Sequence, residues 1–287
     1  MKIAFTKMQG AGNDFVVIDA TRTTLQLSTE QWKKIADRRF GVGADQILVV
    51  ESSDSSEADF VYRIFNADGG EVEQCGNGAR CFVRFVRDRG LTSATTIRVK
   101  TKSGIIAPSI AADGMVTVDM GAPKFDPMSV AFDVQGLVHQ RQGQSDLWQL
   151  NPPQDSPFWI SVVSMGNPHA VQWVDDLEHH PVHRVGAWLE SHPRFAHRVN
   201  AGFVQQHSPT EISLRVFERG SGETLACGTG ACAAVASGVA RGVLQAGQAV
   251  KVHARGGTLS ICWSGTPGAH VMMSGPAEPV FEGVIEL

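Results

Sequence analysis

Residues 66–81 read NADGGEVEQCGNGARC, and residues 218–233 read ERGSGETLACGTGACA. The two segments align without gaps, and Gly, Glu, Cys, Gly, Gly and Ala coincide at matching places. A strand-like run precedes each segment, at 61–65 and 214–217, and a helix-compatible run follows it. This repeat of strand, glycine-rich turn, cysteine and helix predicts two related domains, each presenting one cysteine, Cys75 or Cys227, at a helix N-terminus.

Short β-branched or alternating runs recur along the rest of the chain, and many are bounded by Gly, Asn, Asp or Pro, as strands are. Helical signals are fewer. Ser28 and Gln31 have capping-box spacing and predict a helix that ends near Phe40, and 182–191 is a second candidate. Because the helices do not alternate regularly with the strands, the pattern favours an α+β fold over a doubly wound parallel sheet.

Two prolines bracket the segment 121–127, which we interpret as a linker between the domains. The expected domains are residues 1–122, completed by a C-terminal strand at 277–287, and residues 127–276. Segment 140–157 is rich in Gln, Pro, Asp and Ser, and we expect it to form an exposed excursion without catalytic groups.

The composition and the N-terminal sequence indicate what kind of ligand and which cellular compartment to expect. The formal net charge of −4 over 287 residues provides no basic surface for nucleic acid, so a small polar substrate is expected. Residues 1–7 lack a leader-like apolar region, and no apolar run is long enough to span a bilayer, which predicts a cytoplasmic protein. The cysteines, odd in number and without a CxxC pair, predict free thiols.

The repeated cysteine loop suits acid–base chemistry at carbon. A helix N-terminus carries unpaired backbone N–H groups and about half a positive charge, so it binds a carboxylate and lowers the pKa of a thiol placed there. Inversion of a stereocentre needs a base on one face of the carbon and an acid on the other, and two such loops supply both. Without pyridoxal phosphate as an electron sink, the helix N-termini must stabilise the developing charge.

Seven segments, in chain order, resemble diaminopimelate epimerase: GAGNDF (10–15), GVGADQ (41–46), NADG (66–69), CGNGAR (75–80), GNPH (166–169), ERG (218–220) and CGTG (227–230). The resemblance runs across nearly the whole chain. It implies an isomerase without cofactor or metal that interconverts LL- and meso-2,6-diaminopimelate in lysine and peptidoglycan-precursor biosynthesis. It also implies a homodimer and two pseudo-symmetric domains, each a curled, mainly antiparallel sheet around a central helix.

The resemblance assigns roles position by position. Cys75 and Cys227 are the base and the acid, with the roles exchanged in the reverse direction, and His169 and Glu218 tune the thiols. The residues that it implies for substrate binding are Asn13, Gln46, Asn66, Gly76, Asn77, Asn167, Asn200, Glu218, Arg219, Gly228 and Thr229. Phe281 stands where familiar members have a tyrosine in the dimer contact, so a hydroxyl hydrogen bond is missing there.

The same residues admit other interpretations. A proline racemase or hydroxyproline epimerase would also pair two cysteines, although Arg219 and the asparagines suit a longer substrate with a second charged end. A relative that binds a metabolite without using both thiols is a third hypothesis. A disulfide between Cys75 and Cys227 is the structural alternative, and a reducing compartment disfavours it.

Several further signals favour structural roles. Cys81, Cys232 and Cys262 are expected to be buried and inert. His179 and His183 stand one helical turn apart without HExxH order, which favours a solvated helix face over a zinc site. The glycine-rich turns at 10–12 and 41–43 complete neither GxGxxG nor GxxxxGK[ST], so nucleotide binding is not indicated.

Overall fold

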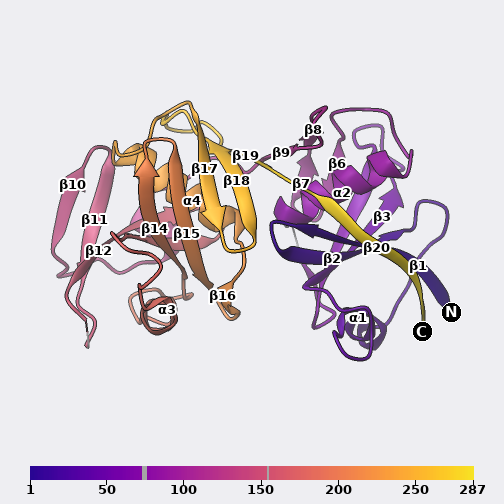
Figure 1. The fold of residues 1–287 in the computed structure, drawn as a ribbon, viewed down its shortest axis with the longest axis horizontal. Coiled ribbons are helices and arrows are strands. Elements are labelled where there is room, and N and C mark those ends of the chain that lie inside the picture. The colour runs from indigo at the N-terminus through magenta and orange to yellow at the C-terminus, as the bar shows by residue number, and fades with distance from the viewer. Residues whose placement is uncertain (73–75, 154) are drawn as a thin grey trace. The chain divides into compact units, whose positions relative to one another are not determined.

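The computed structural model describes residues 1–72, 76–153 and 155–287, and Figure 1 shows its elements. The chain divides into two compact units, one of Met1–Asp119 with Ser274–Leu287 and one of Met120–Met273. Each unit is a mixed β-sheet with few helices, which confirms the α+β prediction. In the described ranges, no helix is long and apolar enough to cross a bilayer.

The sheet of the first unit has the strand order β20-β1-β2-β3-β4-β6-β7, and β5 pairs with β4. β2 runs parallel to β3, and β4 runs parallel to β6, whereas the other neighbours are antiparallel. The elements of this unit are β1 (Lys2–Gly10), β2 (Asn13–Asp19), α1 (Thr29–Ala36), β3 (Gln46–Ser52), β4 (Phe60–Asn66), β5 (Glu71–Val72), α2 (Gly76–Asp88), β6 (Val99–Thr101), β7 (Gly104–Ile106), β8 (Ser109–Ile110), β9 (Val116–Asp119) and β20 (Glu278–Glu286).

The centre of this sheet is apolar on both faces. Residues 15–18 of β2 and 47–50 of β3 are buried without interruption. Such continuous burial is typical of strands covered on both sides, and α2 packs against β1, β2 and β3. The helix that carries the first repeat of the motif is therefore held against the middle of the sheet.

Helix α1 lies in the parallel connection between β2 and β3. Its predicted capping box forms, because Ser28 Oγ accepts from the Gln31 N–H and the Gln31 side chain accepts from the Ser28 N–H. The predicted end near Phe40 was wrong, since the helix ends at Ala36. The chain then turns back, and the N–H groups of residues 42 and 43 both bond to the Ile35 carbonyl.

The C-terminal strand forms one edge of the first unit's sheet. β20 pairs antiparallel with β1 along nearly all of β1. The two termini meet, since the Met1 amino group donates to the Leu287 carbonyl at 2.8 Å, and Figure 1 shows both ends at the same side of this unit. Three large apolar side chains on β20 are exposed: Val280, Phe281 and Val284.

The sheet of the second unit contains the strand order β10-β11-β12-β13-β14-β15-β17-β18, and β16 pairs with β15. β13 runs parallel to β14, and β15 runs parallel to β17. The elements are the 3-10 helix η1 (Pro127–Val130), β10 (His139–Gln142), β11 (Ser145–Leu150), β12 (Phe158–Ser164), β13 (Pro168–Trp173), α3 (Val182–Glu190), β14 (Asn200–Ser208), β15 (Glu211–Glu218), β16 (Gly222–Thr224), α4 (Gly228–Ala240), β17 (Ala249–Ala254), β18 (Gly257–Cys262) and β19 (Met272–Gly275), in which the chain returns to the first unit.

Helix α4 is buried on all sides. Its sequence, GTGACAAVASGVA, is small and apolar all round, which is typical of a helix enclosed by other elements. It packs against β12, β13, β14, β15 and β18. Gly238 allows the close approach, because a Cβ there would lie 2.5 Å from Leu244 Cδ1 and 2.8 Å from the Trp173 ring.

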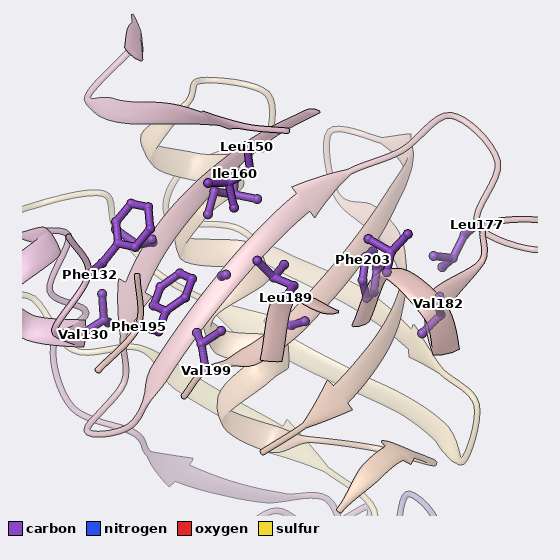
Figure 2. Packing of buried hydrophobic residues seen from close by; sticks show 14 residues of the cluster. Val130, Phe132, Leu150, Ile160, Leu177, Val182, Leu189, Phe195, Val199 and Phe203 are labelled. Carbon is purple, nitrogen blue, oxygen red and sulfur yellow. The ribbon is translucent and has the colours of Figure 1, made fainter. Parts of the chain in front are cut away.

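A second core of this unit lies around α3. Leu189 of α3, Ile160 of β12 and Phe203 of β14 are fully buried in it, and Figure 2 shows their side chains. Phe132 and Phe195 stack beside them with ring centroids 4.5 Å apart. The candidate helix at 182–191 is thus confirmed as an element that covers the sheet.

The two units repeat one plan. Strands β1-β2-β3-β4-β6-β7 of the first correspond to β12-β13-β14-β15-β17-β18 of the second. Their successive pairings are antiparallel, parallel, antiparallel, parallel and antiparallel in both units. Each first parallel connection carries a helix, α1 or α3, and each short strand β5 or β16 precedes the central helix α2 or α4. The repeat in the sequence therefore extends to the topology.

Two regions differ from the expectation. Segment 140–157 is not a bare excursion, because it contains most of the β10–β11 hairpin, in which Leu147 and Leu150 are buried. The polar residues around these leucines hid the strand pattern. In segment 121–127, Lys124 already pairs with Ser164 inside the second unit.

Candidate active site

The repeated motif forms the same local structure in both units. A strand ends at its first residue, Asn66 in β4 or Glu218 in β15, and a helix begins after its cysteine, at Gly76 in α2 or Gly228 in α4. Cys75 itself lies outside the described residues. The cysteine of the second copy, Cys227, is described and is buried.

Cys227 is the N-cap residue of α4. Its Sγ accepts from the Gly230 N–H at 3.4 Å and lies 3.5 Å from Thr229 Oγ1. The thiol thus takes the place of the serine or aspartate oxygen that usually satisfies the first N–H groups of a helix. This is the position that the sequence predicts for a reactive cysteine.

The pKa of Cys227 is nevertheless raised well above its usual value. Burial is the main cause, and the nearby Glu218 carboxylate is the second. The bonds from Thr229 and Gly230 lower the pKa but do not outweigh burial. The Gly230 N–H at the helix N-terminus thus lowers the pKa of Cys227, as expected, but burial and Glu218 outweigh it, so the thiol is protonated at neutral pH.

Glu218 and Arg219 follow one another at the end of β15. The Glu218 carboxylate lies close enough to Cys227 to raise the pKa of its thiol, and it accepts from Thr224 Oγ1 at 2.5 Å. The Arg219 side chain donates to the His197 carbonyl at 3.1 Å. A carboxylate and a guanidinium thus lie at one strand end, beside the helix N-terminus that carries the thiol.

His169 and Asn167 extend this cluster from β13. The His169 Nε2 donates to Asn167 Oδ1 at 3.0 Å, and Asn167 Nδ2 donates to Thr229 Oγ1 at 3.2 Å. Burial, with Arg219 as a second cause, lowers the pKa of His169 to about 3. The His169 imidazole is therefore neutral at physiological pH. Its connection to Cys227 runs through the Asn167 amide and the Thr229 hydroxyl.

Asn200 links the strands beneath these groups. Its Nδ2 donates to the Pro168 carbonyl at 3.1 Å, and its Oδ1 accepts from the Arg219 N–H at 2.9 Å. Asn200 is buried and pairs with His169 in the parallel register of β13 and β14. The Asn200 side chain thus holds the backbone just after the end of β15, at Arg219.

The first unit holds a corresponding polar cluster. Asn77, in the first turn of α2, donates through Nδ2 to Asn13 Oδ1 at 3.3 Å. Asn13 Nδ2 donates to Asp45 at 2.7 Å, and Arg80 Nη1 donates to Asn77 Oδ1 at 2.9 Å. Arg38 in turn donates to Asp45 at 2.8 Å. Both predicted binding asparagines are therefore held in fixed orientations by charged neighbours.

Gln46 and Asn66 form a second pair in this unit. Gln46 Nε2 donates to Asn66 Oδ1 at 2.8 Å, and the two residues are opposite each other in the register of β3 and β4. Beside them, Asp14 accepts from Arg38 and Lys7. Burial raises the pKa of Asp14, but these two bonds outweigh it and hold the pKa well below its usual value.

The strand registers relate the two clusters. In the first unit Phe15 pairs with Gln46, and in the second His169 pairs with Asn200, each across the parallel strand pair. Asn13 and Asn167, two residues before Phe15 and His169, each bond the second residue of the central helix. The predicted site residues therefore occupy matching positions in the two units.

Several residues of these clusters were not predicted, namely Arg38, Asp45, Arg80 and Thr224. Asp45 and Arg80 lie inside quoted motifs, but Asp45 bonds Asn13 of β2, and Arg80 bonds the Pro276 carbonyl as well as Asn77 of its own helix. The repeat could have pointed to Thr224, because the two copies differ both there and at Glu218: Val72 aligns with Thr224, and Asn66 aligns with Glu218.

Three of the signals that favour structural roles can be compared with the described residues. Those residues contain no His, Cys, Asp and Glu group that could hold a metal, and His183 pairs instead with Glu223 at 3.0 Å. Gly10–Gly12 forms the tight β1–β2 turn, in which residues 11 and 12 have positive φ. Cys81 and Cys232 are fully buried, as expected, whereas Cys262 is half-buried.

Comparison with known proteins gives one consistent result. The family model for diaminopimelate epimerase matches residues 5–125 and 161–280. A diaminopimelate epimerase of Herminiimonas arsenicoxydans is 59% identical over 287 residues, covering the whole of both chains. Among solved structures, a PhzF-family phenazine biosynthesis protein of Bacillus anthracis has a TM-score of 0.67 at 18% identity, over all of both chains. A hydroxyproline epimerase of Agrobacterium vitis has a TM-score of 0.67 at 12% identity, covering 99% of this chain and 92% of that one. These two structures share the fold.

Proposed function

The chain belongs to the diaminopimelate epimerase family, and on that premise we propose that Cys75 and Cys227 are the two proton-transfer groups of its reaction. The activity is the epimerisation of diaminopimelate, in lysine biosynthesis. The finer proposal is interconversion of the LL and meso forms, which also serves peptidoglycan-precursor synthesis. The single observation that carries it is the Cys227 thiol capping α4 beside Glu218, in the second copy of a repeat whose first copy carries Cys75 at the matching position.

In the proposed step, one cysteine from each unit acts on the same α-carbon. The Cys75 thiolate removes the α-proton, so that the Cα–H bond breaks and an S–H bond forms. The Cys227 thiol then delivers its own proton to the opposite face and becomes the thiolate. The raised pKa of Cys227 supports the acid role in this direction, and the reverse reaction exchanges the two roles.

The carbanion-like intermediate places negative charge on the substrate carboxylate. We propose that the backbone N–H groups of Gly76–Asn77 and Gly228–Thr229, at the starts of α2 and α4, stabilise this charge. The asparagines and Gln46 would bind the polar ends of the substrate, together with Glu218 and Arg219. The fixed orientations of Asn13, Asn77 and Asn167 support this role, since preorganised groups need not reorient when the substrate binds.

The test is incubation of the reduced protein with LL-diaminopimelate in deuterated water, followed by NMR. We expect meso isomer to accumulate and deuterium to enter at one α-carbon. Cys75→Ser and Cys227→Ser should each lower turnover by a factor on the order of 10³ or more, because serine is a far weaker acid. Cys262→Ser, at the half-buried end of β18, is the matched control and should keep full activity. Exchange with proline or hydroxyproline, but not with diaminopimelate, would favour the alternative substrate class.

We further propose that two copies associate through β20. This strand is a sheet edge that exposes Val280, Phe281 and Val284, and exposed apolar edges tend to pair. Phe281→Asp should then shift the sedimentation of the protein toward that of a monomer, whereas Met128→Asp, an equally apolar exposed site in η1, should not. A monomeric wild-type protein would contradict the proposal.

Because the reaction needs free thiols, we place the protein in the cytoplasm.

A further inference from the structure

Thr224 forms a short side-chain hydrogen bond with Glu218. Its Oγ1 donates to Glu218 Oε1 at 2.5 Å, the length of a strong hydroxyl–carboxylate bond. The two residues belong to the antiparallel pair β15–β16, in which Glu218 is opposite Gly222 and Val216 is opposite Thr224. The hydroxyl therefore reaches the carboxylate diagonally across the hairpin.

The first copy of the repeat provides an internal comparison. There Val72 stands at the place of Thr224, and Asn66 stands at the place of Glu218. Asn66 accepts its bond from Gln46 of β3 instead. In the second unit, a hydroxyl on β16 (Thr224) accompanies a carboxylate at the end of β15 (Glu218). In the first unit, a methyl group on β5 (Val72) accompanies an amide at the end of β4 (Asn66).

The short strand β16 is itself anchored. Glu223, next to Thr224, accepts from Arg215 of β15 at 2.7 and 2.9 Å, and from Arg255 at 3.0 Å. These bonds fix the backbone from which the threonine side chain projects. A β-branched side chain on a fixed strand has few rotamers, so its hydroxyl has a defined direction.

The carboxylate that Thr224 holds at 2.5 Å is also the charged group that raises the pKa of the nearby Cys227 thiol at the start of α4. We propose that Thr224 is a positioning residue, whose hydroxyl fixes the Glu218 carboxylate against Cys227 and so sets the proton-transfer competence of that thiol. The inference rests on the proposed function only for the consequence in catalysis. The coupling among Thr224, Glu218 and Cys227 can be measured without any substrate.

The first experiment compares Thr224→Val with Thr224→Ser in the full-length protein. Valine keeps the shape of the side chain and removes the hydroxyl, so we expect kcat to fall about tenfold, the usual effect of losing a hydrogen bond to a charged group. KM should change by less than about twofold, because the substrate groups stay in place. Serine should restore kcat to within about threefold of wild type.

The matched control is Thr117→Val. Thr117 is also half-buried on a strand, and its hydroxyl bonds one side chain, Ser274, at 2.7 Å. It contacts none of the site residues named above, so kcat should be unchanged. A merely structural role for Thr224 would lower the melting temperature and kcat together, and serine would then restore both in step.

The second experiment measures alkylation of Cys227 by iodoacetamide, with mass spectrometry to resolve each cysteine. Release of the carboxylate favours the thiolate, so Thr224→Val should speed alkylation of Cys227 several-fold at fixed pH. In a Glu218→Ala background the same change should have no further effect, because the group through which Thr224 acts is gone. Equal acceleration in both backgrounds would overturn the proposal, since it would reflect exposure of the thiol alone.

The outcomes separate the two proposals. A wild-type protein without epimerase activity on diaminopimelate would refute the proposed function, and the alkylation cycle would still decide the role of Thr224. An active wild type, with Thr224→Val unchanged in both kcat and alkylation, would refute the role of Thr224 and leave the proposed function standing.

Discussion

Replacing Glu223 by glutamine should destabilise the second unit far more than the matching change, Glu71→Gln, destabilises the first. The Glu223 side chain is only 2% exposed and accepts from Arg215 at 2.7 and 2.9 Å. Arg215 is 18% exposed, so glutamine would leave a largely buried guanidinium without its counter-charge. Removal of one partner of such a pair costs about 3 kcal/mol. The outer contacts, to Arg255 and His183, are solvent-exposed and add little.

The same ion pair in the first unit sits nearer the surface. Glu71 is 27% exposed and bonds Arg63, which is 34% exposed, at 2.9 Å. Arg63 also lies 3.5 Å from Glu51, which can take over part of the charge compensation. A partly exposed pair with a second acceptor is worth about 1 kcal/mol. The expected difference between the two substitutions is therefore about 2 kcal/mol.

Hydrogen exchange followed by mass spectrometry measures each unit separately. In Glu223→Gln, the exchange of amides in β14 and β15 should accelerate about a hundredfold, and in Glu71→Gln that of β3 and β4 about fivefold. Each substitution should leave the other unit unchanged. Equal effects in the two units, or a larger one for Glu71, would refute the assignment of the cost to burial.

The pH dependence of stability is an independent check of the contribution that the Glu223–Arg215 ion pair makes. The hydrogen bond from Arg215 lowers the pKa of Glu223 from its ordinary value of 4.5. A lowered folded-state pKa gives stability that is fully present above about pH 4.5 and is lost as the pH falls through the folded-state value. The gap between wild type and Glu223→Gln should thus stay constant from neutral pH to about pH 5 and narrow below about pH 4.

Three further predictions follow from the described contacts. Arg80→Met should free the Asn77 amide and raise KM for diaminopimelate about tenfold, measured by the NMR assay, with Arg84→Met as a surface control on the same helix. Because bonds from basic side chains hold the pKa of Asp14 low against burial, its contribution to the free energy of unfolding should be present above about pH 4 and disappear in acid, so urea titrations of Asp14→Asn and wild type should converge there. Gly238→Ala should overpack α4 against Leu244 and lower stability by about 1–3 kcal/mol, seen as a lower urea midpoint, whereas Gly242→Ala, which meets no atom but has positive φ, should cost about 1 kcal/mol or less.

The repeat and the pattern of strands and helices were enough to predict the fold class, whereas the assignment of the site residues stays a prediction. Both helices that start at a cysteine loop, and the capping box at Ser28, depend on local signals that a sequence displays directly. The roles of Cys75 and its neighbours stay predictions, since that cysteine lies outside the described residues. The comparison with relatives established the family independently of those roles.

What the sequence did not reveal depends on burial and on distant partners. The thiol pKa of Cys227 is set by burial more than by the helix N-terminus, and burial cannot be read from a turn motif. Arg80 looks like a solvent-exposed helix residue in the sequence, yet it is fully buried and orients Asn77. Leu147 belongs to a strand that its polar neighbours concealed. In each case burial by the rest of the fold, rather than a local signal in the sequence, decides the environment of the residue.

The division of the chain also sets the order in which the protein can fold during synthesis. The second unit is one continuous stretch, Met120–Met273, whereas the first needs β20, which is synthesised after the second unit, as the neighbour of β1. The unit that carries Cys227 therefore does not depend on β20, whereas β1 keeps an unpaired edge until β20 has been synthesised and released. A released chain truncated after Met273 should contain a folded second unit and an aggregation-prone first one.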